Sequence, residues 1–254
     1  MLVDTHIHTT LSFDSSLELK DALRAAQAMD VGITITDHLD LDMDMEPFDP
    51  EYYREIYGPH RSDRFFLGTE WGMDPRFTEE NKEYLKISAP DFILGSVHNL
   101  VDDDIYDMAT YEKYEEEEFW ARYFSYTMEC LVTHPFIDSL GHIDFPSRKR
   151  PYGVEGFSFR RHEKGLLPIY EFLADRDKAL ELNLRRFSEA TLEEFKEHFS
   201  VFRELGGRYV TLGSDAHHKE PIGRNMRKAA ELLKSLDLKP VHYDRHEPVV
   251  DTIL

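Results

Sequence analysis

Hydrophobic and polar positions follow two alternating patterns along this chain. Short apolar and β-branched runs such as VGITIT at 31–36 are typical of strands that are covered on both faces. Between these runs, apolar residues recur every three or four positions, as Phe195, Phe199 and Phe202 do, which is typical of a helix with one buried face. The alternation predicts parallel strands joined by helices.

Seven runs are predicted to be strands, the first beginning near Val3 and the others spanning 31–36, 65–71, 92–98, 139–144, 179–184 and 209–214. The helical pattern covers 19–29, 78–87, 115–131, 166–175, 192–205 and 224–236. Ser15 and Ser16 precede the first helix and are expected to cap its free N–H groups.

This series predicts an α/β fold with a parallel sheet, either open or closed into a barrel, and the patterns alone hardly separate the two. We expect one domain over 1–254, because no internal repeat and no linker rich in Gly, Pro or Ser interrupts the chain. Two acidic stretches, 39–53 and 99–118, are predicted to be surface loops or solvated helix starts.

The net charge of −20 argues against a nucleic-acid or anionic membrane partner, since both attract clustered Lys and Arg. The only cysteine, Cys130, excludes an internal disulfide and a cysteine-rich zinc site; we expect a buried thiol in a reducing compartment. The chain shows no basic-then-apolar leader and no apolar run of ~18 residues. These features predict a cytoplasmic protein, and we take a monomer as the default.

Histidine changes the picture, because there are 13 histidines in the chain and several stand where predicted strands end. In a parallel α/β barrel every strand delivers its carboxyl end to the same mouth, so such side chains converge. Imidazole and carboxylate donors without thiolate suit zinc, manganese or iron. The strand-end residues that predict a metal site are His6, His8, His38, Glu70, His98, His142, Asp215 and His217.

The same positions fall in ordered motifs: DTHIHT at 4–9, TDH at 36–38, GTE at 68–70, SVH at 96–98, GHID at 141–144 and GSDAH at 213–217. In these motifs the chain resembles the polymerase and histidinol phosphatase (PHP) superfamily. The resemblance implies a distorted barrel of seven β/α units that holds two to three divalent metal ions. By its length and by LELN at 180–183 before the arginine pair at 185–186, the chain is most similar to the stand-alone histidinol-phosphate phosphatases of histidine biosynthesis.

The resemblance also implies a ligand set for each ion. The first set is His6, His8, Glu70 and Asp215, and the second is Glu70 as a bridge, His98 and His142. The third set is His38, His217 and a position that is often histidine in relatives, which is Asp14 in this chain.

Asp14 can alternatively be a helix N-cap, since Asp is a favoured capping residue. Three further carboxylates, Asp4, Asp37 and Asp144, are expected to orient ligand imidazoles rather than to bind metal themselves.

Two ions that share Glu70 can hold a bridging water as hydroxide and clamp the oxygens of an in-line displacement, which is the chemistry of phosphoester hydrolysis. The candidate catalytic residues are Glu70, Asp215 and His217. The general acid for the leaving group stays open between Asp215, His217 and a metal-bound water.

Residues 145–164 carry a local excess of four positive charges in this acidic chain, and guanidinium groups bind phosphate in a bidentate manner. Family resemblance and strand-end position favour Arg160 and Arg186, with Asn183 close by, as candidate substrate-binding residues. Arg185 and Arg224, which follow the sixth and seventh predicted strands, stay open as further members. A small phosphomonoester that carries its own amine, such as histidinol phosphate, suits a basic spot within an acidic rim.

Two alternatives remain. A PHP-type nuclease or nucleotide phosphodiesterase should show a longer basic track or stacking aromatic residues. A non-catalytic metal-binding PHP module should show a degenerate ligand set, and only Asp14 departs from the common pattern.

Overall fold

A ring of parallel strands forms the centre of the molecule. The computed structural model describes residues 1–41, 48–101, 103–148 and 158–253. In the order in which they neighbour one another, the ring strands are β1 (Val3–Ile7), β2 (Gly32–Ile35), β4 (Phe65–Gly72), β5 (Phe92–Ser96), β8 (Ser139–Leu140), β9 (Ala179–Asn183) and β10 (Tyr209–Gly213). Each pairs in parallel with the next.

The ring is closed by the segment that follows β10. Ile7 and Ala216 form a parallel bridge, in which the His8 N–H donates to the Ala216 carbonyl at 2.9 Å and the Ala216 N–H donates to the His6 carbonyl at 3.3 Å. The seven predicted strands therefore make the α/β barrel that the family resemblance implied. β8 has only two residues, and this short strand accounts for part of the distortion.

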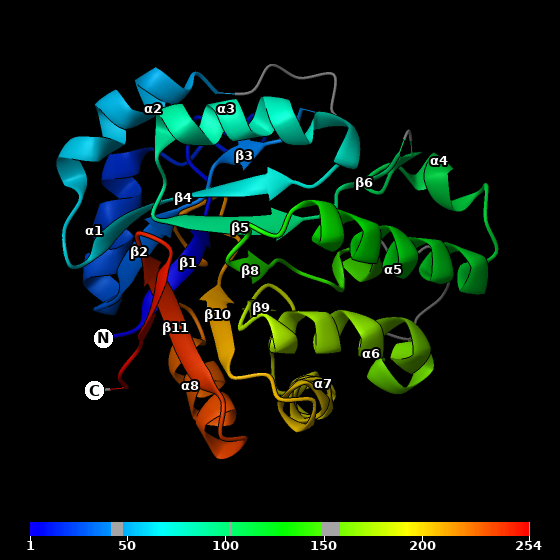
Figure 1. Cartoon of the computed structure of the whole chain (residues 1–254). Coiled ribbons are helices and arrows are strands. Elements are labelled where there is room, and N and C mark those ends of the chain that lie inside the picture. Colours follow the sequence, from blue (N-terminus) through cyan, green and yellow to red (C-terminus); the bar gives the residue numbers. More distant parts are fainter. Residues whose placement is uncertain (42–47, 102, 149–157, 254) are drawn as a thin grey trace.

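Helices surround the barrel (Figure 1). They are α1 (Leu19–Met29), α2 (Pro50–Tyr57), α3 (Thr78–Ser88), α4 (Met108–Tyr111), α5 (Glu116–Thr133), α6 (Phe159–Asp175), α7 (Leu192–Glu204) and α8 (Met226–Ser235). The apolar stripe of α7 is buried as predicted, at Phe195, Phe199 and Phe202. Cys130 on α5 is also buried, and its Sγ lies 3.2 Å from the Met73 carbonyl oxygen. None of the helices in the described part of the chain has the length and apolar character that a membrane span requires.

The predicted serine cap of α1 is wrong. The residue at the N-cap position is Glu18, whose side chain makes no capping hydrogen bond. The Ser15 hydroxyl instead lies 3.0 Å from the His8 carbonyl oxygen and 3.2 Å from that of His217. Ser15 thus ties the first loop to the segment that closes the barrel.

Several short elements in the acidic stretches were not predicted. They are β3 (His38–Leu39), which pairs with β4, and the hairpin of β6 (Asn99–Leu100) and β7 (Asp103–Asp104). The helices α2 and α4 begin within the two stretches, in line with the predicted helix starts. Strands of two residues contain no period that a sequence pattern can reveal. Positions 42–47 of the first acidic stretch lie outside the described residues.

The last two strands, β11 (Lys239–Asp244) and β12 (Glu247–Val250), were also not predicted. β11 pairs in parallel with the start of β10, and β12 folds back antiparallel on β11. Val241 and Tyr243 of β11 pack against Phe92 and Ala179, which begin β5 and β9. This hairpin therefore covers the amino end of the barrel, opposite the strand ends that carry the candidate ligands.

His198 of α7 makes the stability of the fold depend on pH. The ring is buried, and the Tyr170 Oη lies 2.6 Å from its Nδ1. Burial lowers the pKa of His198 to about 4. Nearby Asp144 acts to raise this pKa, and Arg186 acts to lower it. Because this pKa lies below the ordinary value of 6.5, the unfolded chain takes up the proton first, and stability is lost as the pH falls between the two values.

We predict that His198→Asn, whose amide oxygen can accept the Tyr170 hydrogen bond, removes about 2 kcal/mol of the stability difference between pH 7 and pH 5. Urea unfolding of both proteins at the two pH values, in the presence of a chelator, measures this difference. Equal pH dependence of the two proteins would contradict it.

Candidate metal centre

The mouth of the barrel holds a cavity of about 470 Å³ at the carboxyl ends of the strands. Six of the predicted strand-end residues line it, and His6 and His8 lie beneath, fully buried. The lining members are His38, Glu70, His98, His142, Asp215 and His217, joined by Asp14. The structure therefore brings all nine candidate metal ligands into one cluster.

Glu70 is at the centre of this cluster, on β4. Its Oε1 lies 2.7 Å from His142 Nε2 and 3.3 Å from His98 Nε2. The Ser96 hydroxyl donates to the same oxygen at 2.7 Å. One side of the carboxylate thus faces the two imidazoles that follow β5 and β8.

The other oxygen of Glu70 faces three further imidazoles. Its Oε2 lies 3.2 Å from His6 Nε2, 3.3 Å from His8 Nε2 and 3.2 Å from His38 Nδ1. Yet Oε2 is buried and accepts no hydrogen bond from the residues that the structure describes. A buried carboxylate oxygen without a hydrogen bond is costly, so this atom needs a cation.

His6 and His8 are turned toward each other by fixed partners. His6 Nδ1 lies 2.6 Å from Glu181 Oε1, and His8 Nδ1 lies 3.1 Å from Ser12 Oγ. Their Nε2 atoms are 3.0 Å apart and lie 3.7 and 3.4 Å from Asp215 Oδ1. Fixing Nδ1 leaves the Nε2 lone pairs to a metal ion.

On the far side of Glu70, Asp40 performs the same task for His98, since its Oδ1 lies 2.9 Å from His98 Nδ1. Its Oδ2 lies 3.0 Å from His38 Nδ1, but neither atom has a hydrogen bond among the described residues. Glu181 and Asp40 are therefore carboxylates outside the candidate ligand set that contact ligand imidazoles directly.

The three carboxylates predicted for that role have other contacts. Asp4 accepts the N–H groups of Ser214 and Gly223, and burial raises its pKa to about 6. Asp37 accepts the Ser12 hydroxyl at 2.8 Å, so it reaches His8 only through Ser12. Asp144 forms an ion pair with Arg186. By these contacts Asp37 supports a ligand imidazole indirectly, as predicted, whereas Asp4 and Asp144 hold backbone groups and an arginine instead.

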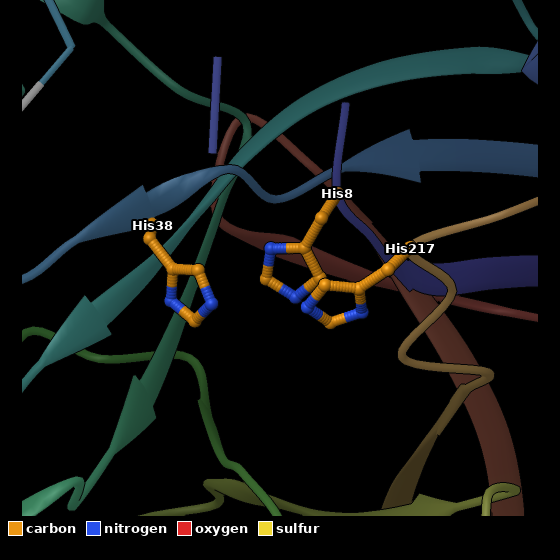
Figure 2. Close-up of side chains that lie close together, drawn as sticks. All are labelled: His8, His38 and His217. Atoms are coloured by element: carbon orange, nitrogen blue, oxygen red, sulfur yellow. The ribbon is translucent and has the colours of Figure 1, made fainter. Parts of the chain in front are cut away.

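Figure 2 shows a third group of imidazoles, in which buried His8 lies beside the slightly exposed rings of His38 and His217. His8 stacks between His38 and His217, with ring centroids 4.2 and 4.3 Å away. Asp14 is beside them, with Oδ2 2.8 Å from His217 Nε2 and Oδ1 3.6 Å from His38 Nε2. The side chain of Asp14 thus faces the cluster and does not cap α1.

The electrostatics of the cluster favour cations. Burial by itself would lower the pKa of His6, but the carboxylates of Glu70 and its neighbours hold this pKa well above its ordinary value. Burial by itself would raise the pKa of Glu70, but the surrounding imidazoles hold it well below. Burial and the neighbouring His38 lower the pKa of His8 to about 3. Protons on some imidazoles balance the carboxylates in the protein alone, and divalent ions can replace those protons.

Asp215 has an unusual backbone, with φ of 54°, a left-handed conformation that is uncommon outside glycine. Such conformations cluster at functional sites. Its Oδ2 lies 2.6 Å from Arg148 Nη1 and 3.4 Å from Asn183 Nδ2. Burial would raise the pKa of Asp215, but the Arg148 guanidinium and His6 hold it well below its usual range.

The structure does not place the three candidate substrate-binding residues together. Asn183 is buried beside Asp215, and Arg186 lies behind the cavity wall, paired with Asp144 and Glu194. Arg160 is not among the residues that line the cavity. It lies in the first turn of α6, its side chain is 83% exposed, and it pairs with Glu197.

Two other arginines line the cavity, Arg148 and Arg185. Arg148 Nη2 is buried without a hydrogen-bond partner among the described residues. The sequence placed Arg148 in the basic segment and Arg185 after the sixth predicted strand, but no pattern preferred them to Arg160. Glu181 and Asp40 had a usable signal, since Glu181 is two residues before Asn183 on one strand and Asp40 is two residues after His38.

The donor set fits divalent metal ions. Triads of donors whose atoms lie within 4.8 Å of one another recur four times: His8, His38 and His217; His6, Glu70 and His142; His6, His8 and Asp215; and His38, Glu70 and His98. Zinc, manganese and iron sites share nitrogen and oxygen donors, and the ligand imidazoles of such sites are commonly hydrogen-bonded to carboxylates through their other ring nitrogen.

Comparison with known proteins agrees with this geometry. The family model described as PHP domain matches residues 4–185. This chain belongs to the PHP family. The matched stretch holds each candidate ligand of the PHP domain up to His142, and Asp215 and His217 follow it.

Similar relatives of this PHP protein cover nearly the whole chain. A probable histidinol-phosphatase of Clostridium acetobutylicum is 34% identical over 96% of this chain and 98% of its own. The histidinol-phosphatase of Lactococcus lactis is 31% identical over 91% of this chain and 90% of its own. A crystal structure of the Lactococcus lactis histidinol phosphate phosphatase, in complex with zinc, L-histidinol and phosphate, has a TM-score of 0.86, 27% identity and 98% coverage of both chains.

We predict that Glu70→Gln lowers both the bound metal and the turnover of a phosphomonoester, the turnover by about a hundredfold or more. The neutral amide keeps the volume of the side chain but removes the charge that the ions share. Metal content by mass spectrometry and steady-state turnover measure the two effects. Glu79→Gln on the surface of α3 is the matched control, and full metal content in Glu70→Gln would refute the central role of this carboxylate.

Proposed function

We propose that this protein is a metal-dependent phosphatase that hydrolyses L-histidinol phosphate to L-histidinol and phosphate, a step of histidine biosynthesis. The observation that carries the proposal is the position of the metal-binding donors on the floor of a cavity whose wall bears the guanidinium groups of Arg148 and Arg185. The likeness to a phosphatase crystallised with zinc, L-histidinol and phosphate supports the choice of substrate.

The residues that would hold the ions fall into three sets. His6, His8, Glu70 and Asp215 would form the first, and Glu70 with His98 and His142 the second. His38, His217 and Asp14 would form a third, so that two to three zinc, manganese or iron ions are bound. Such ions supply Lewis-acid stabilisation of phosphoryl oxygens and acidify a water molecule to near neutral pKa.

The other residues of the cavity bind and orient the substrate. Arg148, held by Asp215 at 2.6 Å, has a second nitrogen left for a phosphate oxygen, and Arg185 adds a second guanidinium. We assign the proton that the leaving alkoxide takes up to His217, whose Nδ1 lies 3.6 Å from the Asp215 carboxylate oxygen Oδ1, so that ionised Asp215 would orient it. Asn183 would orient Asp215 through its amide N–H, and Arg186 would hold Asp144 in an ion pair behind the site.

Neither alternative function gains support from a specific observation. Among the residues that the structure describes, the basic groups at the mouth are Arg148 and Arg185 and form no track for a nucleic acid backbone, and the chain carries a net charge of −20. A non-catalytic module would have lost donors, whereas the cluster brings every candidate ligand together. We extend the proposal to a single-domain monomer that works in the cytoplasm without a nucleic-acid partner.

We predict that the metal-loaded protein hydrolyses L-histidinol phosphate with a higher kcat/KM than sugar phosphates, nucleotides or a dinucleotide. A chelator should abolish this turnover, and added divalent metal should restore it. Phosphate release across the substrate panel, with metal content measured on the same sample, tests both statements. Equal turnover of all phosphomonoesters would refute the substrate assignment and leave the hydrolase standing.

We predict that Arg148→Lys raises KM for histidinol phosphate about tenfold or more, because lysine cannot reproduce the guanidinium's paired hydrogen bonds. Arg160→Lys is the matched control and should stay within about twofold of the parent protein, as exposed ion pairs contribute little. The reverse ranking of the two variants would return Arg160 to the site.

A further inference from the structure

Ser12 lies in the loop between β1 and α1, and the mechanism above gives it no role. The side chain is buried, and its Oγ has three partners. His8 Nδ1 lies 3.1 Å away, Asp37 Oδ1 lies 2.8 Å away, and the backbone N–H of His38 donates to Oγ at 3.1 Å. A serine hydroxyl has one proton to donate and two lone pairs that accept. The three partners therefore use its full hydrogen-bonding capacity.

Asp37 determines where the proton of Ser12 goes. Its Oδ1 accepts the backbone N–H of Thr9 at 2.6 Å, and its Oδ2 accepts the hydroxyl of Tyr57 at 3.0 Å. The Thr9 hydroxyl also donates to Oδ2, at 3.0 Å. Donors thus reach both oxygens, which is the arrangement of a carboxylate that only accepts. The Ser12 hydroxyl therefore donates its one proton to Asp37.

This direction leaves the two lone pairs of Ser12 for His38 and His8. The backbone N–H of His38 can only donate, so it takes one lone pair. The other lone pair faces His8 Nδ1, which must then carry a proton, because a nitrogen lone pair there would meet the lone pair of the hydroxyl. A neutral imidazole has one proton, so His8 Nε2 keeps its lone pair. That nitrogen lies 3.3 Å from Glu70 Oε2 and 3.4 Å from Asp215 Oδ1, among the donors of the metal centre.

Ser12 supports its imidazole differently from the carboxylate behind the neighbouring ligand. The Nδ1 atom of His6 contacts the Glu181 carboxylate directly, at 2.6 Å. At His8 a hydroxyl stands between the imidazole and its carboxylate, and the same hydroxyl holds the backbone of His38. One atom of Ser12 thus supports a candidate ligand of the first ion and a candidate ligand of the third.

We propose that Ser12 is a positioning residue for metal binding, which sets the tautomer of His8 so that the Nε2 lone pair is directed at the ion before any ion binds. The inference deepens the proposed function and rests on the metal binding that this function requires, not on the identity of the phosphoester. Without the hydroxyl, His8 would be free to carry its proton on either nitrogen. The tautomer with the proton on Nε2 has no lone pair there for a metal ion.

The test measures zinc binding by the metal-free protein in competition with a chromophoric chelator. Ser12→Ala should lower the zinc affinity about 10- to 100-fold, which is the usual effect of removing a hydrogen-bond partner of a ligand. Ser12→Thr keeps the hydroxyl and should restore most of the affinity. Ser88→Ala is the matched control, because Ser88 is also buried, its hydroxyl donates to the Tyr84 carbonyl of the same helix at 2.9 Å, and it does not line the cavity.

The ring ¹⁵N chemical shifts of His8 in the metal-free parent protein report the tautomer directly, and the proton should be on Nδ1. A proton on Nε2 would overturn the inference, and this measurement stays decisive even if Ser12→Ala does not fold. An unchanged zinc affinity of Ser12→Ala would also overturn it. So would an equal loss of affinity in Ser12→Thr, with circular dichroism and urea unfolding in chelator showing that the variant folds.

These measurements separate the inference from the proposed function. If the parent protein binds zinc and hydrolyses histidinol phosphate while Ser12→Ala binds zinc equally well, the inference fails alone. If the parent protein and Ser12→Ala differ in zinc affinity as expected but the parent protein does not hydrolyse histidinol phosphate, the proposed function fails and the role of Ser12 stands.

Discussion

The structure of the mouth depends on one buried carboxylate, Glu70, surrounded by imidazoles. A carboxylate whose two oxygens are shielded from water is stable only when opposite charges or hydrogen-bond donors surround it. Here those groups come from the ends of several strands, so they meet only because the segment at Ala216 pairs with Ile7 and closes the barrel. The fold and the candidate metal centre are therefore parts of one arrangement, since opening the ring at this bridge would move His6 and His8 away from Asp215.

The backbone around the centre is shaped by the support that the ligands need. A side chain on Gly213 would place its Cβ 2.2 Å from Glu181 Oε1 and 2.4 Å from His6 Cβ. Glycine at this position lets Glu181 approach His6, and Gly72 makes the same room for Asp40. Gly213 and Gly72 thus make room for the two carboxylates that support the candidate metal ligands.

Sequence reasoning was strongest where a chemical pattern and a structural period coincide. His6 and His8, two residues apart at a strand end, had to face the same way, and strand-end donors had to meet in any closed parallel barrel. Sequence patterns carry no information on the distances between side chains that stand on different strands and loops of the barrel. Sequence reasoning could not tell that Arg148, in a short 3₁₀ turn, reaches Asp215, while Arg160 on α6 turns outward to Glu197. It also missed β11, because a strand that covers the end of a barrel is not part of the repeating β/α pattern.

The hairpin of β6 and β7 follows His98 within a few residues, and Asp104 and Tyr106 at its end line the cavity, yet it supplies none of the nine candidate metal ligands. This wall of the cavity therefore belongs to a separate excursion between β5 and α5. A substitution in that excursion would reshape the cavity without moving the strand ends that carry the candidate ligands.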